Sequence, residues 1–86
     1  MLLFFMWFVY IIKCKDGSLY TGITNDLERR FLEHKNLKGG HYTKSHKVLE
    51  RIYSEQLSSR SLALKRERQI KGWRREKKLL LITMSA

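Results

Sequence analysis

The apolar positions of the first 24 residues follow a strand-like pattern. Residues 7–13 (WFVYIIK) are rich in β-branched and aromatic side chains, which is typical of an inner strand. Residues 15–17 (KDG) have the composition of a tight turn, and residues 18–24 (SLYTGIT) return to strand-forming residues. The two runs together predict a β-hairpin.

Helical periodicity begins after the hairpin. Asn25 is followed by Glu28 three residues later, which resembles a capping box, so we expect Asn25 to be the N-cap of a helix that runs to about Asn36. Residues 38–47 (KGGHYTKSHK) contain two glycines, two histidines and three lysines, and they predict a flexible basic loop.

A third strand and two further helices complete the pattern. Residues 48–55 predict a strand, although charged residues blur its alternation. Ser58 or Ser59 caps a second helix that runs through Trp73, and residues 74–83 predict a short third helix. The order ββαβα(α) predicts a small α/β fold, more strictly α+β, in which a three-stranded sheet is flanked by helices.

The length of 86 residues allows one hydrophobic core, so we expect a single domain. Its core would span residues 7–73, with residues 1–6 as an apolar overhang and residues 74–86 as a basic and apolar helix. The apolar run up to Ile12 is too short to span a bilayer and lacks the features of a signal peptide, so we expect no membrane association. Whether the native start is the first methionine or Met6 is left open.

The charge of the chain indicates a polyanionic partner. Eighteen Lys and Arg against eight Asp and Glu give a net charge of +10 and a pI near 10.1. Such a surplus favours contacts with phosphate groups, although ribosomal RNA or a membrane surface would satisfy it as well as DNA. Cys14 is the only cysteine, which excludes an intramolecular disulfide and a cysteine-based zinc cluster. We therefore expect a cytoplasmic protein.

The hairpin turn determines which side chains share a face of the sheet. A three-residue loop of a type I turn plus a left-handed glycine would pair Ile12 with Tyr20 and Tyr10 with Gly22. Tyr10 and Tyr20 would then lie on one face, whereas a two-residue turn would send them to opposite faces. The alternative explanation for two strand tyrosines is ordinary packing.

Polar residues also interrupt the apolar stripes of both long helices. Arg30 and His34 follow Leu27 at helical spacing, where the first helix should meet the sheet; a snorkelling arginine and a rim histidine are the alternative. Glu67 lies on the apolar face of the second helix, where a carboxylate is costly unless it is paired or binds a cation. Lys71, four residues later, is the alternative partner.

These groups match the needs of phosphodiester hydrolysis. A carboxylate holds a metal ion that acts as a Lewis acid, and an arginine stabilises the charge on the phosphate. A phenol takes or relays a proton, provided that a nearby positive charge lowers its pKa from about 10. Because only one carboxylate is available, we expect one ion.

The same residues, in this order, resemble the GIY-YIG nuclease family. The two triplets of the family correspond to Val9-Tyr10-Ile11 and Tyr20-Thr21-Gly22, and an arginine ten residues after the second tyrosine is Arg30. A histidine or tyrosine four residues later is His34, and the metal-binding glutamate within ALKRERQIK is Glu67. The resemblance implies a GIY-YIG-like fold, with Tyr10, Tyr20, Arg30, His34 and Glu67 as catalytic residues. It also implies cleavage of DNA with a bound Mg²⁺ or Mn²⁺ held by Glu67.

The resemblance covers residues 7–73 and is closest to the small stand-alone bacterial branch. That branch resembles the N-terminal nuclease domain of the excision-repair nuclease subunit, which suggests a role in DNA repair. Phe8 replaces a glycine of many members, Thr21 replaces an isoleucine, and no asparagine follows Asn36. Because so small a domain presents few groups that read bases, we expect recognition of single-stranded or branched DNA with little sequence specificity.

Basic residues outside the catalytic set are candidates for DNA contacts, with solvated side chains as the alternative. They are Lys38, His41, Lys44, His46, Lys47, Arg66 and Lys71. We therefore expect a metal-dependent DNA endonuclease. The alternatives are a non-catalytic nucleic-acid-binding module of the same fold, or a basic RNA-associated protein. The choice of general base among Tyr10, Tyr20 and His34, the position of the cut and the oligomeric state are left open.

Overall fold

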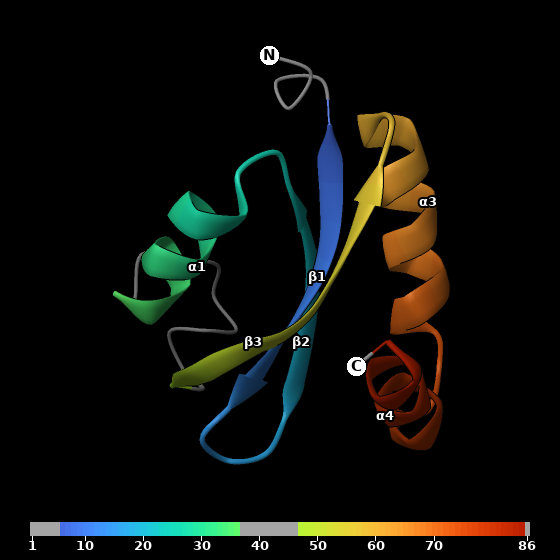
Figure 1. Cartoon of the computed structure of the whole chain (residues 1–86). Helices are drawn as coiled ribbons and strands as arrows, with labels where there is room; N and C mark the ends of the chain where they lie inside the picture. The colour runs from blue at the N-terminus through green and yellow to red at the C-terminus, as the bar shows by residue number, and fades with distance from the viewer. Residues whose placement is uncertain (1–5, 37–46, 86) are drawn as a thin grey trace.

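Helices cover both faces of a three-stranded antiparallel sheet (Figure 1). The structure, a computed structural model, describes residues 6–36 and 47–85. Along the chain the elements are β1 (Trp7–Cys14), β2 (Leu19–Thr24), α1 (Leu27–Lys35), β3 (Val48–Leu57), α3 (Arg60–Lys71) and α4 (Arg75–Met84). The order ββαβαα confirms the predicted fold class. Among the residues described, no helix combines the length and the hydrophobicity needed to cross a membrane.

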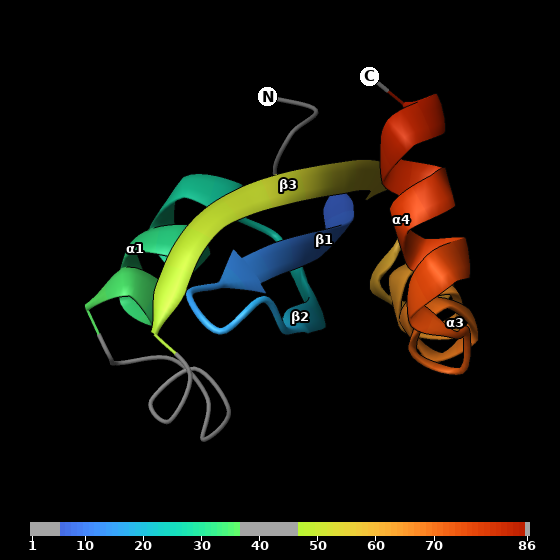
Figure 2. The same ribbon diagram turned by 90° about the horizontal axis from the view of Figure 1, so that it is seen from below.

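The central strand β1 separates the hydrophobic core into two halves. The strand order is β2-β1-β3. Val9 and Ile11 face α3 and pack against Ala63 and Ile70. The alternate residues of β1 face α1, which lies on the opposite side of the sheet from α3 and α4 (Figure 2). The strand is therefore buried on both faces, as its nearly continuous apolar sequence predicts.

The hairpin has the predicted three-residue turn. The amide of Cys14 donates to the carbonyl of Ser18 at 2.9 Å, and the amide of Gly17 donates back to the carbonyl of Cys14 at 2.9 Å. Gly17 has a φ of +85°, in the left-handed region that glycine adopts without a steric penalty. Tyr10 therefore pairs with Gly22, and the predicted register is confirmed.

The helix α1 begins one residue later than predicted, so the assignment of Asn25 as its N-cap is wrong. Asp26 is the cap: its side chain accepts a hydrogen bond from the amide of Arg29 at 3.1 Å. The amide of Asp26 is held by the hydroxyl of Thr24 at 3.0 Å, and the side chain of Asn25 instead accepts from the Arg29 guanidinium at 3.2 Å. The helix ends at Lys35, close to the expected end.

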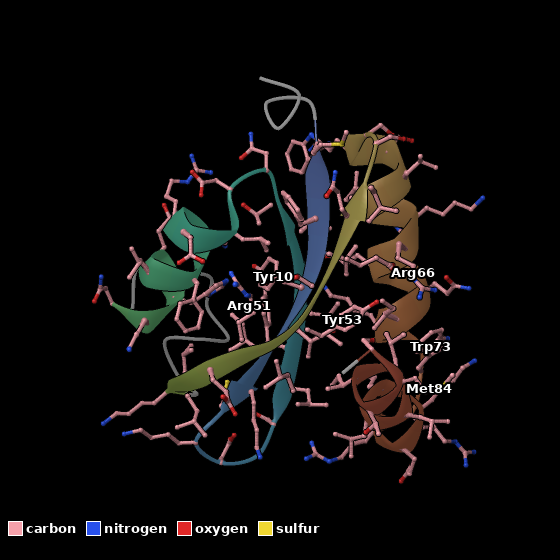
Figure 3. The ribbon with its side chains drawn as sticks, viewed as in Figure 1. Tyr10, Arg51, Tyr53, Arg66, Trp73 and Met84 are labelled. Carbon is pink, nitrogen blue, oxygen red and sulfur yellow. The ribbon has the colours of Figure 1, made fainter. Side chains whose placement is uncertain are left out.

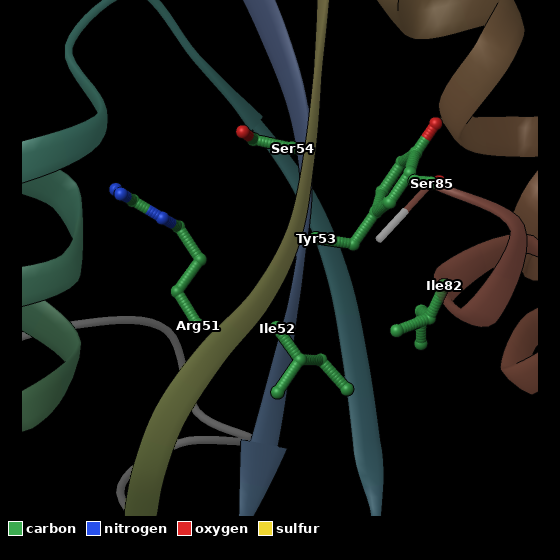
Figure 4. A pocket seen from close by; sticks show the side chains of 6 residues that line it. All are labelled: Arg51, Ile52, Tyr53, Ser54, Ile82 and Ser85. Atoms are coloured by element: carbon green, nitrogen blue, oxygen red, sulfur yellow. The ribbon is translucent and has the colours of Figure 1, made fainter.

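β3 is irregular where the predicted alternation was blurred. Ile11 pairs with Tyr53 and Ile12 pairs with Arg51, so Ile52 has no partner of its own and forms a bulge. Arg51 and Tyr53 consequently point to opposite sides of the strand, Arg51 towards α1 and Tyr53 towards α4 (Figure 4). The bulge explains why a strict two-residue period could not be read from this segment.

The later elements end close to their predicted positions. β3 continues to Leu57, two residues beyond the expected end. Ser59 is the N-cap of α3, with its hydroxyl accepting from the amide of Leu62 at 3.1 Å. The helix ends at Lys71, before Gly72, so the prediction that it continues through Trp73 was two residues too long.

The helix α4 is fixed at its first turn. Arg75 donates from Nη1 to the carbonyl oxygen of Gly17 at 2.7 Å, which connects α4 to the hairpin turn. Towards its other end, α4 leaves a hollow of about 380 Å³ against β3 (Figure 4). The hollow is lined by Arg51, Ile52, Tyr53, Ser54, Ile82 and Ser85.

Gly22→Ala should destabilise the protein, because the hairpin leaves no room for a side chain beside Tyr10. A Cβ atom there would come within 2.5 Å of the Tyr10 hydroxyl oxygen and 3.1 Å of a Tyr20 ring carbon. We expect the free energy of unfolding to fall by about 1–3 kcal/mol, as for other overpacked cores. Urea denaturation measures this change.

Gly72→Ala is the matched control. A Cβ atom at Gly72 would lie 3.5 Å from the carbonyl oxygen of Gln69, an ordinary van der Waals contact, and φ is −77°. We expect its stability to equal or slightly exceed that of the wild type. Equal stabilities of the two variants would contradict the close packing at Gly22.

Candidate active site

Tyr10 and His34 form the buried centre of the candidate site. The hydroxyl oxygen of Tyr10 lies 2.8 Å from Nε2 of His34, a hydrogen bond between β1 and α1. Tyr10 is 3% exposed and His34 is 0% exposed. The alternative that His34 is a rim residue is therefore wrong, because the helix docks with this edge directly on the sheet. Figure 3 shows Tyr10 on the side of the sheet that faces α1.

Burial keeps both groups of this pair uncharged. It is the main cause that lowers the pKa of His34 to about 4, and the charge of Arg30 adds to the effect. Burial also raises the pKa of Tyr10 to about 12, although a hydrogen bond from Arg30 opposes the shift. At neutral pH the site therefore contains a neutral imidazole and a protonated phenol.

Tyr20 provides a second phenol on the same face. Its ring centroid lies 6.3 Å from that of Tyr10 and 5.2 Å from that of His34, and the Tyr20 and His34 rings pack edge to face. Tyr20 is only partly buried, because β2 is an edge strand. The prediction that both tyrosines share one face is confirmed, and Tyr20 is the more accessible phenol.

Arg30 lies one turn before His34 on α1 and borders the same site. Its Nη1 atom forms a 3.1 Å ion pair with Glu33, and 29% of its side chain is exposed. Its positive charge is close enough to Tyr10 to oppose the rise in the pKa of that phenol. The guanidinium thus combines proximity to the buried phenol with access to solvent, which a phosphate-binding group requires.

Glu67 approaches the site from α3, which covers the other face of the sheet and packs against β2. Its side chain is 15% exposed, and its Oε2 atom lies 3.4 Å from Nζ of Lys71. The negative charge of Glu67 contributes to raising the pKa of Tyr10, after burial and the charge of Tyr20. Nζ of Lys71 lies 6.0 Å from the centroid of the Tyr20 ring. The Glu67 carboxylate, the Lys71 ammonium and the partly exposed phenol of Tyr20 therefore lie close together near the β2 edge.

The donor set at Glu67 suits a hard divalent cation that keeps most of its water. No group of three or more His, Cys, Asp or Glu able to hold a metal occurs in the described ranges. Mg²⁺ is commonly bound by one or two carboxylates together with water and substrate phosphate, and an all-oxygen site favours Mg²⁺ or Mn²⁺. A single partly buried carboxylate at the edge of the site fits this mode of binding.

Two features of the site were not predicted. The approach of Lys71 to Tyr20 depends on how α3 sits against β2, which the spacing along one helix does not reveal. Thr21 is 3% exposed, and within the described part of the chain its hydroxyl has no hydrogen-bond partner. Thr21 pairs with Ile11 and so faces α3, the helix that carries Glu67.

The candidate DNA-binding residues have different positions. Lys38, His41, Lys44 and His46 lie outside the described residues, and Lys47 is exposed. Arg66 is held by Glu55 at 2.8 Å and lies 5.2 Å from the centroid of a Trp73 ring, on the side of the sheet away from α1 (Figure 3). The expected contact between Arg66 and DNA therefore gains no support from its placement.

Comparison with known proteins identifies the family to which the chain belongs. Residues 6–79 match the GIY-YIG catalytic domain, so the chain belongs to the GIY-YIG family. The match includes every proposed catalytic residue and both tyrosine triplets. Membership of this family implies a nucleic-acid substrate and a nuclease type of reaction.

The individual relatives are small bacterial UPF0213 proteins. One from Staphylococcus saprophyticus is 49% identical over 76 residues, which cover 88% of this chain and 93% of the relative. One from Staphylococcus haemolyticus is 47% identical over 75 residues, with 87% and 92% covered. The solution NMR structure of a UPF0213 protein from Bacillus halodurans is 35% identical, covers 92% of this chain and 84% of that chain, and superposes with a TM-score of 0.60.

The stability of the protein should fall as the pH is lowered from about 6.5 to about 4. The pKa of His34 is about 4 in the folded state and about 6.5 when unfolded, so the unfolded chain binds the additional proton in this interval. The loss attributable to His34 should reach about 2–3 kcal/mol at pH 4.5. Urea denaturation at pH 7.0, 5.5 and 4.5 measures it.

The control is His34→Gln, which removes the titration. The difference in stability between wild type and variant should shrink by about 2–3 kcal/mol between pH 7.0 and pH 4.5. A difference that is independent of pH would contradict a buried neutral His34.

Proposed function

We propose that the protein is a divalent-metal-dependent endonuclease that hydrolyses phosphodiester bonds in DNA. The observation that supports this most strongly is the convergence of two phenols, an imidazole and a carboxylate from four different elements near the edge of β2. Arg30 adds a positive charge to the same face. The family to which the chain belongs implies a nucleic-acid substrate.

Tyr20 is the group that we assign as general base. Tyr10 is an unfavourable choice because its pKa is raised to about 12 and its hydroxyl is engaged with His34. His34 is wholly buried, without access to a water molecule. Tyr20 is partly exposed, and it faces both the buried pair and the ammonium of Lys71.

The reaction requires one proton transfer to the protein and one to the leaving group. Tyr20, in its phenolate form, takes a proton from the water that attacks phosphorus; the P–O ester bond then breaks, and the leaving oxygen takes a proton from a solvent water molecule. Arg30 binds the non-bridging oxygens, whose negative charge grows in the transition state. Glu67 would hold the divalent cation, Mg²⁺ or Mn²⁺, which when bound would supply Lewis-acid stabilisation of the same charge. Tyr10 and His34 stay uncharged and take no part in proton transfer; their hydrogen bond fixes β1 against α1 and so positions the site.

Recognition should depend on the backbone and the form of the DNA more than on its sequence. The net charge of +10 favours phosphate contacts, and a chain of 86 residues presents few groups that could read base edges. We propose single-stranded or branched DNA as the substrate.

A second candidate function is a non-catalytic nucleic-acid-binding module of the same fold. The observation that favours it is the ion pair between Glu67 and Lys71, which already neutralises the carboxylate. Such a module would bind DNA without turnover in any divalent metal. Binding that prefers duplex RNA over branched DNA would instead favour an RNA-associated protein.

Glu67→Gln should abolish metal-dependent cleavage but preserve DNA binding. Removal of the only proposed metal ligand should lower the rate by about a hundredfold or more. Even loss of a residue that only hydrogen-bonds to a metal ligand typically lowers metal affinity or activity by about 10–100-fold. The measurement is cleavage of labelled single-stranded, duplex and branched DNA with Mg²⁺, Mn²⁺ or EDTA, alongside binding by fluorescence anisotropy. Glu76→Gln, an exposed carboxylate of α4 with the same charge change, should cleave like the wild type. Cleavage that survives Glu67→Gln would defeat the assignment.

Tyr20→Phe should remove the general base with little effect on the fold. We expect the rate to fall by about 10²–10⁴-fold and the rise of the rate with pH to disappear. Tyr10→Phe should retain that rise, while losing stability because the buried hydrogen bond between residue 10 and His34 is removed. The pH–rate profiles of both variants, measured beside their unfolding curves, test the assignment. A Tyr20→Phe enzyme with the wild-type profile would transfer the role to another group.

A further inference from the structure

Lys71 occupies a position that the proposed reaction does not explain. Its ammonium lies 3.4 Å from the Glu67 carboxylate and 6.0 Å from the centroid of the Tyr20 ring. The Lys71 side chain is 50% exposed, whereas that of Glu67 is 15% exposed. A positive charge therefore already lies where a divalent cation would bind, and it belongs to the more exposed partner of the pair.

We propose that Lys71 is an exchangeable counter-ion of Glu67. In the absence of metal its ammonium neutralises the carboxylate; when a divalent cation binds Glu67, the ammonium leaves it and contacts a DNA phosphate instead. This inference rests on the proposed function, because it takes Glu67 as the metal ligand and the site beside Tyr20 as the place of the phosphate.

The chemistry of lysine suits such an exchange. Its charge is a compact point on a flexible four-carbon stem, and its three donors can be redirected by rotation. An ammonium and a divalent cation repel one another, so the two cannot both lie against one carboxylate without a loss of affinity. A phosphate placed beside them removes this penalty, since it attracts both.

Binding of metal and DNA should therefore be coupled. Without DNA, the ammonium competes with the metal and keeps metal affinity low. With DNA, the ammonium has a second acceptor and the carboxylate becomes available. By thermodynamic linkage, metal must strengthen DNA binding by the same factor by which DNA strengthens metal binding. The protein would load its metal mainly when substrate is present.

A purely structural role makes a different prediction. If Lys71 only stabilised the helix as an i, i+4 partner of Glu67, its replacement would lower stability slightly and leave metal affinity unchanged. Other cations of α3 are not equivalent to Lys71: Arg66 is held by Glu55, and Lys65 is exposed two residues before Glu67, a spacing that does not face it. Lys65→Met is therefore a matched control with the same change of charge.

The test is Mn²⁺ binding to the full chain without DNA, followed by electron paramagnetic resonance and by calorimetry. Lys71→Met should bind Mn²⁺ about five- to tenfold more tightly than the wild type, given the charge removed beside the ion. Lys71→Arg, which keeps the charge, and Lys65→Met should bind as the wild type does. Glu67→Gln shows the level of binding that is unrelated to this site. Equal or weaker binding by Lys71→Met, or no binding above that of Glu67→Gln in any variant, would overturn the proposal.

The coupling is measured with a branched DNA in the Tyr20→Phe background, in which the strand should stay intact. DNA should tighten Mn²⁺ binding when Lys71 is present, and this gain should vanish with Lys71→Met; an unchanged gain would overturn the exchange to phosphate.

The experiments distinguish failure of the counter-ion proposal from failure of the proposed function. If the protein cleaves no DNA but Lys71→Met binds Mn²⁺ more tightly, the proposed nuclease activity is refuted and the counter-ion role of Lys71 stands. If the protein cleaves DNA but Lys71→Met does not change its Mn²⁺ affinity, the counter-ion role is refuted and the nuclease activity stands.

Discussion

Pairing of Tyr10 with Gly22 across the hairpin is the constraint on which the candidate site depends. The turn at Gly17 sets the register, and the register places both phenols on one face of the sheet. Gly22 lets the Tyr10 ring lie against the backbone of β2, and from there its hydroxyl reaches His34 on α1. This hydrogen bond joins the sheet to α1, the helix that also carries Arg30.

The site has a neutral interior and a charged margin. Tyr10 and His34 are buried, hydrogen-bonded and uncharged, and they provide a fixed surface of low polarity. Arg30, Glu67 and Lys71 surround them with side chains that solvent can still reach. Charges at such a boundary interact more strongly than in bulk water but retain enough hydration to avoid the full penalty of burial. This separation suits a substrate whose phosphate charge must be approached and then released.

Much of the fold follows from local chemistry, whereas the docking of its elements does not. The hairpin and its register follow from the turn residues Lys15-Asp16-Gly17 and the two-residue alternation on either side, whereas the pairing of β3 with β1 was not predicted. The N-cap was assigned wrongly because Asn25 and Asp26 can both cap a helix, and the sequence does not show that the side chain of Asp26 accepts the hydrogen bond from the Arg29 amide. The complete burial of His34 and the bulge at Ile52 arise from contacts between segments distant in sequence. Spacing along one helix likewise revealed the pairing of Glu67 with Lys71 but not the approach of Lys71 to Tyr20.

The position of β2 at the border of the sheet has a topological consequence. Reactive groups buried in a tunnel must receive a chain by one of its ends, but Tyr20 lies on a strand that, among residues 6–36 and 47–85, has no further strand on its outer side. For the proposed activity, this border would allow a long polymer to be laid sideways against it at any point along its length. Circular or internally branched molecules are then as accessible as linear fragments, and no terminus has to be found first.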